Sequence, residues 1–294
     1  MAPPRLVVTC LQTAPRLGDL GANLAELADL IAQAVAGGAH LVITPELSCT
    51  GYFLRDLVPE VAVAVDGDEL GQLARAAGDG LALVGAVVES SDHLFHNAAV
   101  LVGQGSVRVV HRKVYLPTYG LFDEQRYLAA GDRFEVVAIP GSGGSFWRVG
   151  LCICEDLWHP SAPWLLSLQR MDLLVCPSAS PGRGVRAGLG GLGSATSYQA
   201  MTRTYAELLT CFVAHCNRVG YEDGVGFWGG SRVLGPDGEP VAGPLGADRG
   251  ALTAVLERGH LRRARIAFPL LRDERVEVTR SGLDRLGARA GVPE

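Results

Sequence analysis

Short apolar segments of strand length alternate with amphipathic segments of helix length along most of this chain of 294 residues. We expect strands at residues 5–12, 41–44, 81–88, 146–154, 173–177 and 212–217, and helices at residues 24–35, 69–77, 164–169 and 196–209. Hairpins are expected around the glycine-containing turns at residues 103–106 and 236–238. This alternation predicts a layered α/β protein with mixed sheets.

No linker rich in Pro, Ser or charge divides the sequence, and no internal repeat is visible, so we expect one domain over residues 1–294. The arginine-rich stretch 258–294 also carries apolar residues. We therefore expect it to be an amphipathic C-terminal segment that closes this domain.

Composition argues against several classes of partner. The net charge of -5 argues against nucleic acid, since a phosphate backbone requires a dense basic face. No apolar run approaches the roughly 18 residues of a membrane span, and residues 1–12 lack the layout of a signal peptide. Seven scattered cysteines, most of them inside apolar runs, favour a reducing cytoplasm.

Only one of the 26 basic residues is a lysine, Lys113. All other basic residues of the chain are arginine, so arginine is used wherever any cation would serve. Lysine is used at this position alone. A compact ammonium can exchange a proton or point at a single oxygen, which the wide arginine fork does not do. Lys113 is therefore a candidate functional residue.

Polar residues with useful chemistry follow three of the apolar strands: Glu46, Lys113 and Cys154. In layered α/β folds, sites are built at the carboxyl ends of strands. A thiol is only a few per cent ionised at pH 7, so it needs a base, such as Glu46, and a cation, such as Lys113. The same cation would stabilise an oxyanion. Glu155, beside the cysteine, would oppose ionisation unless its side chain points away.

These residues lie in segments that resemble three signatures of the nitrilase (carbon–nitrogen hydrolase) superfamily, in the same order and at the same spacings: 41–52 (LVITPELSCTGY), 111–117 (HRKVYLP) and 150–156 (GLCICED). The similarity continues through three shorter segments: 96–100 (HNAAV), 216–220 (CNRVG) and 229–231 (GGS). The resemblance implies a four-layer α-β-β-α sandwich. It also implies a reaction that needs no metal or organic cofactor. It also implies a homodimer or larger oligomer that pairs through a helical face.

The resemblance assigns roles to four residues. It implies that Glu46 is the general base, that Lys113 stabilises the intermediate and that Cys154 forms a thioester. Glu124 matches a second glutamate that helps to hold the lysine and the substrate. The implied reaction is attack of Cys154 on a small amide, loss of ammonia, and hydrolysis of the thioester.

Segments 115–124 (YLPTYGLFDE), 154–160 (CEDLWHP) and 178–181 (SASP) resemble more closely the glutaminase domain of glutamine-dependent NAD synthetases. This resemblance implies that Tyr119, Ser180 and Arg186 hold glutamine, and we include Glu155 among the substrate-binding candidates. Arg186 suits an α-carboxylate because its fork binds two oxygens. Arg183 is the substitute in the same loop.

The sequence lacks an ATP-binding synthetase domain after this region, so we expect that it does not make NAD alone. It would supply ammonia to a separate synthetase or act as a free-standing amidase. The main alternative is a hydrolase of N-carbamoyl compounds or of another ω-amide. A non-catalytic subunit is a second alternative. A dinucleotide-binding oxidoreductase is a third, because residues 188–193 (GLGGLG) match G-x-G-x-x-G but do not directly follow a strand.

Two other patterns are interpreted as structural. Cys152 and Cys154 alternate with Ile153 on a predicted strand, so their side chains should face the same way. They lack the second ligand pair that a metal site requires. His215 is expected to be a core residue with satisfied ring nitrogens. Phe122 and Trp158 are candidates for pocket walls or core.

Overall fold

The computed structural model describes residues 4–184 and 192–290. Its strands are β1 (Arg5–Gln12), β2 (Leu41–Ile43), β3 (Leu81–Glu89), β4 (Phe95–Gly103), β5 (Ser106–Arg112), β6 (Val136–Pro140), β7 (Phe146–Leu151), β8 (Leu173–Ser178), β9 (Phe212–Asn217), β10 (Val219–Glu222), β11 (Val225–Trp228), β12 (Arg232–Leu234), β13 (Pro240–Ala242) and β14 (Gly250–Glu257). Its α-helices are α1 (Leu20–Ala36), α2 (Val58–Val61), α3 (Asp68–Ala76), α4 (Glu124–Tyr127), α5 (Ser161–Leu168), α6 (Gly193–Leu208), α7 (Arg258–Ala267), α8 (Leu270–Asp273) and α9 (Val276–Ala290). Three 3₁₀ turns are η1 (Arg55–Leu57), η2 (Ser142–Gly144) and η3 (Cys154–Trp158).

The strands form two six-stranded mixed sheets and a separate hairpin, β10-β11. The first sheet has the order β14-β1-β2-β3-β4-β5, and the second has the order β13-β12-β9-β8-β7-β6. β1, β2 and β3 pair in parallel, as do β7, β8 and β9. The two expected hairpins are present as β4-β5 and β12-β13.

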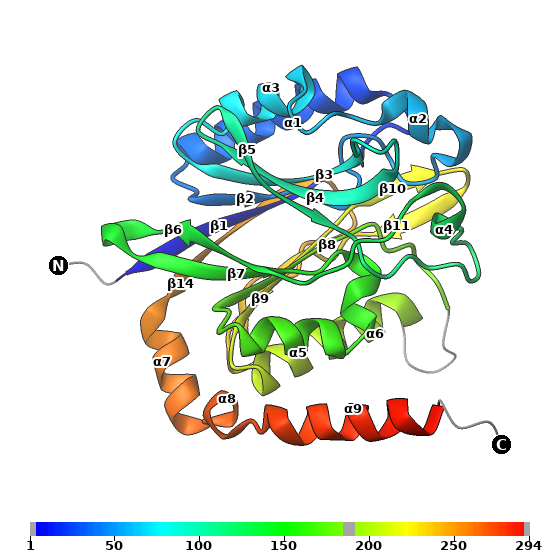
Figure 1. Ribbon diagram of the computed structural model, residues 1–294. Helices are drawn as coiled ribbons and strands as arrows, with labels where there is room; N and C mark the ends of the chain where they lie inside the picture. The colour runs from blue at the N-terminus through cyan, green and yellow to red at the C-terminus, as the bar shows by residue number, and fades with distance from the viewer. Residues whose placement is uncertain (1–3, 185–191, 291–294) are drawn as a thin grey trace.

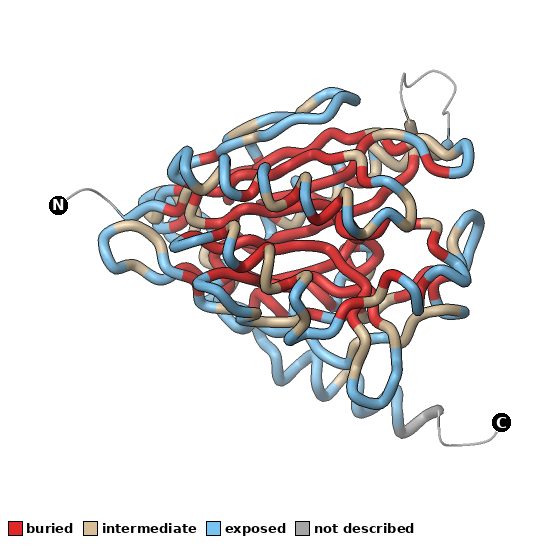
Figure 2. Tube along the Cα trace, turned by 90° about the horizontal axis from the view of Figure 1, so that it is seen from above, coloured by how far each residue is buried: buried red, intermediate tan, exposed pale blue. Residues whose placement is uncertain are grey.

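The two sheets lie face to face between outer layers of helices, with α1 and α3 on one side and α5 and α6 on the other (Figure 1). Residues from both sheets contribute to one buried cluster, including Leu6 and Val8 of β1 and Leu173 and Val175 of β8. Figure 2 shows this buried layer running through the centre of the molecule. The expected four-layer α-β-β-α sandwich is confirmed.

Helix α1 shows how the pattern of the sequence positions an outer layer. Leu24, Leu27 and Ile31 lie on one face at helical spacing and are buried against the first sheet. Burying a side chain of this size contributes about 1.5–3 kcal/mol. The Asp19 side chain accepts a hydrogen bond of 3.1 Å from the Ala22 amide and caps the start. The helix ends before Gly38, whose φ of 95° is unfavourable for other residues.

The strand predicted at residues 146–154 is three residues too long. β7 ends at Leu151, and Cys154 begins the 3₁₀ turn η3 with φ of 46°. The apolar run continues to Ile153, so hydrophobic pattern alone cannot locate the turn. The prediction that Cys152 and Cys154 face the same way from a strand is therefore wrong.

Strand β14, which completes the first sheet, was not predicted. It pairs antiparallel with β1 from Arg5↔Glu257 to Gln12↔Gly250. Its inward residues, Ala254 and Leu256, are buried, whereas Val255 is 45% exposed. This alternation over residues 252–256 is a strand signal.

The C-terminal segment begins with α7, of which Leu261 is buried. Helix α9 lies beyond α5 and α6 on the outer side of the second sheet (Figure 1). Leu283 and Leu286 of α9 are more than 60% exposed, at 62% and 63%. The segment therefore presents apolar side chains to its surroundings.

Candidate active site

The topology brings the three predicted strand ends to neighbouring edges. Strand β5 runs in the same direction as β2 and β3, because β3-β4 and β4-β5 are both antiparallel. Glu46 and Lys113 therefore follow strands that end at the same edge of the first sheet. Cys154 follows β7 in the second sheet.

Glu46 is buried, and both of its carboxylate oxygens have partners. Oε1 accepts hydrogen bonds from Asn97 Nδ2 at 2.8 Å and from Lys113 Nζ at 2.6 Å. Oε2 accepts from the backbone amide of Ala179 at 2.8 Å. Ala179 follows β8 of the second sheet, so this carboxylate joins the two sheets. Three donors fix its orientation.

The Lys113 ammonium lies between two carboxylates, at 2.6 Å from Glu46 Oε1 and 2.7 Å from Glu124 Oε1. Burial alone would lower the pKa of Lys113, but Glu124 and Glu46 outweigh it and hold the pKa well above its usual range. Lys113 is therefore a cation at neutral pH.

Two carboxylates share this one cation, which favours a proton on one of them. Burial raises the pKa of Glu124 to about 7; Glu46 adds to the rise and Lys113 opposes it. Tyr52 donates a short hydrogen bond to Glu124 Oε1, while Oε2 has no partner among the described residues. Glu124 can therefore exchange a proton near neutral pH.

Cys154 lies at the start of η3 in the left-handed region of backbone conformation. This conformation is costly for a residue with a Cβ, so its surroundings must hold it there. Asp156, which is fully buried, supplies part of this support. Its Oδ2 accepts from the Ile153 amide at 2.9 Å, and its Oδ1 accepts from the Val114 and Tyr115 amides at 3.1 and 2.9 Å. Asp156 thus ties the cysteine turn to the residues after Lys113.

Burial raises the pKa of the Cys154 thiol well above its usual range, and the Glu46 carboxylate raises it further. Lys113 and a hydrogen bond with Tyr198 act in the opposite direction. The resting group is therefore a thiol that must lose its proton to a base before it can attack a carbonyl carbon. The neighbouring Glu155 carboxylate accepts hydrogen bonds from Tyr119 Oη at 2.9 and 3.1 Å.

Cys154 opens onto a cavity of about 370 Å³. Five of the predicted residues line it: Tyr119, Phe122, Glu155, Trp158 and Ser180. Arg183, the predicted substitute for Arg186, and Tyr198 line it too. The Ser180 hydroxyl accepts from Trp228 Nε1 at 3.1 Å. The predicted substrate ligand Arg186 and most of the G-x-G-x-x-G segment lie outside the described residues.

Arg183 supplies a cation at the rim of this cavity. Its guanidinium carbon lies 5.3 Å from the centre of the Phe122 ring and 5.9 Å from that of Tyr119. These distances allow cation–π attraction. The aromatic rings thus hold a positive charge at the cavity, where it can attract an anion.

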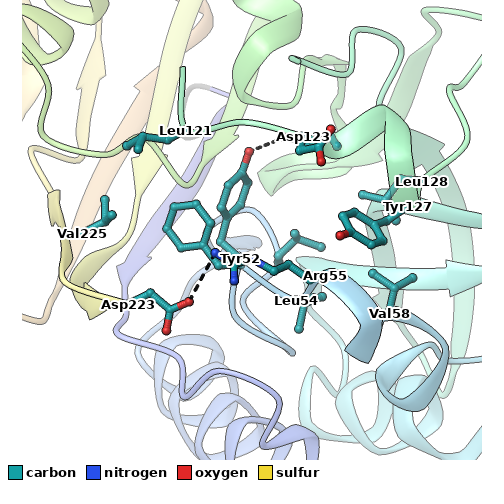
Figure 3. A pocket seen from close by; sticks show the side chains of 13 residues that line it. Tyr52, Leu54, Arg55, Val58, Leu121, Asp123, Tyr127, Leu128, Asp223 and Val225 are labelled. Atoms are coloured by element: carbon teal, nitrogen blue, oxygen red, sulfur yellow. Dashed lines mark hydrogen bonds and ion pairs between the residues drawn. The ribbon is translucent and has the colours of Figure 1, made fainter. Parts of the chain in front are cut away.

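A second cavity, also of about 370 Å³, is lined by Glu124 and Tyr52 among others. Tyr52 stands in the middle of it, with Leu121 and Val225 on one side and Tyr127 on the other (Figure 3). The Tyr52 and Phe122 rings meet edge to face, 6.1 Å apart, between the two cavities.

Three site residues were not identified from the sequence. Asn97 and Asp156 lie inside the quoted motifs, but their contacts depend on sheet pairing. Tyr198 lies near the start of a predicted helix with no motif around it, and its hydroxyl is 3.2 Å from Cys154 Sγ. The prediction that the ring nitrogens of His215 have hydrogen-bond partners is wrong, because neither nitrogen has a partner among the described residues. Burial lowers its pKa to about 3, so the ring stays neutral.

Within residues 4–184 and 192–290, no helix has the length and apolar character needed to cross a membrane. The same residues contain no group of three or more His, Cys, Asp or Glu side chains placed to hold a metal ion.

Residues 7–266 match the carbon–nitrogen hydrolase family. The glutamine-dependent NAD(+) synthetase of Thermotoga maritima is 34% identical over 243 residues, which are 81% of this chain and 39% of that protein. The chain thus spans about two fifths of this relative's length.

Two solved structures are similar over most of the chain. The carbon–nitrogen hydrolase of Helicobacter pylori G27 has a TM-score of 0.79 at 25% identity, covering 93% of this chain and 96% of that one. The glutamine-dependent NAD+ synthetase of Acinetobacter baumannii has a TM-score of 0.76 at 26% identity, covering 87% of this chain and 46% of that one. The fold, the order of the motifs and the family match agree, and the chain belongs to the carbon–nitrogen hydrolase family.

Proposed function

We propose that this protein hydrolyses the C–N bond of a small amide through a thioester on Cys154. The observation that carries the proposal is the buried Lys113 ammonium, held between Glu46 and Glu124 at 2.6 and 2.7 Å next to the nucleophile's turn. Such a cation can favour the thiolate and then the oxyanion of a tetrahedral intermediate.

The proposed reaction has two stages. Glu46 takes the thiol proton, Cys154 Sγ attacks the amide carbon, and the charge that develops on the carbonyl oxygen is stabilised by Lys113. The C–N bond breaks as Glu46 returns the proton to nitrogen, and ammonia leaves. Water then gives a proton to Glu46 and attacks the thioester, which releases the acid and the thiol. Glu124 keeps Lys113 in place.

We propose a glutamine-like substrate, with a carboxylate and an ammonium at the end remote from the amide. Arg183 at the rim suits the carboxylate, and Glu155, which Tyr119 positions, suits the ammonium. Ser180 lines the same cavity. Arg186, the first candidate from the sequence, lies outside the described residues and becomes the second candidate for the carboxylate. The similarity to glutamine-dependent NAD(+) synthetases supports this substrate class.

We also propose the cellular setting. Residues 1–294 would act as one carbon–nitrogen hydrolase domain with 258–294 as its closing segment. The exposed apolar side chains of α9 support a homo-oligomer. Ammonia would pass to a separate synthetase or to solution. The seven cysteines are all unpaired, which supports a reducing cytoplasm.

The test is ammonia release from a panel of amides: glutamine, butyramide as a neutral aliphatic amide, and an N-carbamoyl amino acid. We expect turnover of glutamine in preference to butyramide. Release of carbon dioxide with ammonia from the carbamoyl compound, without turnover of glutamine, would favour the N-carbamoyl alternative. No turnover of any amide would contradict the proposed function.

A further inference from the structure

Tyr198 lies against the candidate nucleophile, outside the cluster of Glu46, Lys113 and Glu124. Its hydroxyl oxygen is 3.2 Å from Cys154 Sγ, and the residue is 2% exposed. The contact joins α6 to η3 across 44 residues of sequence. It therefore depends on how α6 packs on the second sheet.

Aromatic neighbours fix the ring of Tyr198 on several sides. It stacks on His215 at 4.7 Å between centroids, and Trp158 meets it edge to face at 5.7 Å. Trp228 lies at 6.1 Å. Because the imidazole is neutral, the stack is held by ring contact and not by charge. The hydroxyl is thus aimed at Sγ by a rigid framework.

The chemistry of the two groups decides which one donates. A thiolate has no proton, whereas the phenol keeps its own, because burial and then Cys154 raise the pKa of Tyr198 well above its usual range. Whenever Cys154 is ionised, Tyr198 O–H must therefore be the donor. Hydrogen bonds to an ionised acceptor are about twice as strong as neutral ones.

We propose that Tyr198 is a catalytic residue whose hydroxyl stabilises the Cys154 thiolate before attack and again when the thioester breaks down. Only the second part of this proposal, the role in thioester breakdown, rests on the proposed function. In that step water attacks the thioester carbon and gives its proton to Glu46. The C–S bond then breaks with its electron pair on sulfur. Tyr198 donates a hydrogen bond to this sulfur without transferring its proton, and Glu46 passes the proton from water to the thiolate.

The test is Tyr198→Phe, which removes one oxygen and keeps the ring stack. Alkylation of Cys154 by iodoacetamide is followed against pH by peptide mass spectrometry, since only the thiolate reacts. Loss of one charge-assisted hydrogen bond should move the profile up by about one pH unit and slow alkylation about tenfold at pH 7. Hydrolysis of a preformed Cys154 thioester should slow by a similar factor.

Tyr205→Phe is the matched control. Tyr205 lies on the same helix, and its hydroxyl donates to the Leu157 carbonyl oxygen at 3.1 Å, not to Sγ. We expect it to keep the wild-type alkylation profile. Thermal melts of both variants report whether the fold is intact.

Two results would overturn the proposal: a folded Tyr198→Phe protein with the wild-type profile, or an equal shift in Tyr205→Phe. The alkylation measurement uses no substrate. If the wild type hydrolyses no amide, the proposed function fails, while the alkylation profile still decides whether Tyr198 stabilises the thiolate.

Discussion

The backbone amide of Ala179, after β8 of the second sheet, donates a hydrogen bond of 2.8 Å to Oε2 of Glu46, after β2 of the first. This hydrogen bond fixes the position of Oε2 in the Glu46 carboxylate. Asn97 and Lys113 set the other side through Oε1. The position of the proposed base therefore depends on how closely the backbone around it is packed.

Gly85 of β3 controls that packing. A Cβ at this position would lie 2.8 Å from the Glu46 carbonyl carbon and still closer to Pro45 O and Leu47 N. Gly85→Ala must therefore push the Glu46 backbone away, at a cost of about 1–3 kcal/mol. We expect a lower melting temperature and a kcat at least about tenfold lower, since misplaced catalytic groups lose rate steeply.

The control is Gly21→Ala on α1, where an added Cβ meets no atom within 4 Å. It should leave kcat unchanged and leave stability the same or slightly higher. Wild-type kcat in a folded Gly85→Ala protein would show that Glu46 tolerates displacement.

Lys113→Arg keeps the positive charge but replaces a compact ammonium with a wide planar fork. The ammonium is buried between two carboxylate oxygens at 2.6 and 2.7 Å, which leaves little space for the larger group. We expect kcat/KM to fall at least about a hundredfold, the scale of losing one oxyanion donor. Near-normal turnover would mean that generic positive charge suffices.

Glu124 should make the free energy of unfolding depend on pH in the direction opposite to most carboxylates. Its folded pKa is about 7, above the ordinary value of 4.5, because of burial. Between these values the native state holds a proton that the unfolded chain has released. The contribution of Glu124 to stability should therefore be fully present below about pH 4.5 and should be lost as the pH rises to about 7.

Urea unfolding of the wild type and of Glu124→Gln at several pH values isolates this effect. The wild type should lose stability relative to the variant between pH 4.5 and 7. If the wild type instead gains stability relative to the variant over that range, Glu124 is ionised in the native state and Lys113 dominates its pKa.

Arg183→Ala tests the anchor for the substrate carboxylate. The guanidinium lies over the Phe122 ring at 5.3 Å, at the rim of the Cys154 cavity. Loss of a charge-assisted contact should raise KM for glutamine at least about tenfold and leave KM for butyramide within about twofold. Equal changes for both substrates would show that Arg183 supports the loop and does not bind the carboxylate. A selective effect in Arg186→Ala alone would assign the carboxylate to Arg186.

The three strand ends that carry Glu46, Lys113 and Cys154 could be found from the sequence, because each polar group follows an apolar run. Hydrophobic pattern also located most elements of the sandwich. Hydrophobic pattern did not predict the end of β7 before Cys154, because the apolar run continues into a turn that is seen only in the backbone conformation. It also missed β14, whose alternating residues adjoin an arginine-rich stretch.

Contacts between elements that are far apart in the chain could not be predicted from the sequence. Tyr198 reaches Cys154 only because α6 packs on the second sheet. The raised pKa of Glu124 follows from burial beside Glu46, which no local pattern shows. Arg183 was only the substitute for Arg186 in the sequence analysis, and its position over Phe122 and Tyr119 makes it the first candidate for the substrate carboxylate.

The most direct test of the central claim is the rate of ammonia release by Cys154→Ala on the best substrate of the wild type. Removing the thiol leaves the Asp156 contacts to the turn in place, so the variant should fold. We expect turnover at the background of the uncatalysed reaction, with a melting temperature near that of the wild type. Ammonia release at a rate near that of the wild type would contradict the thioester mechanism.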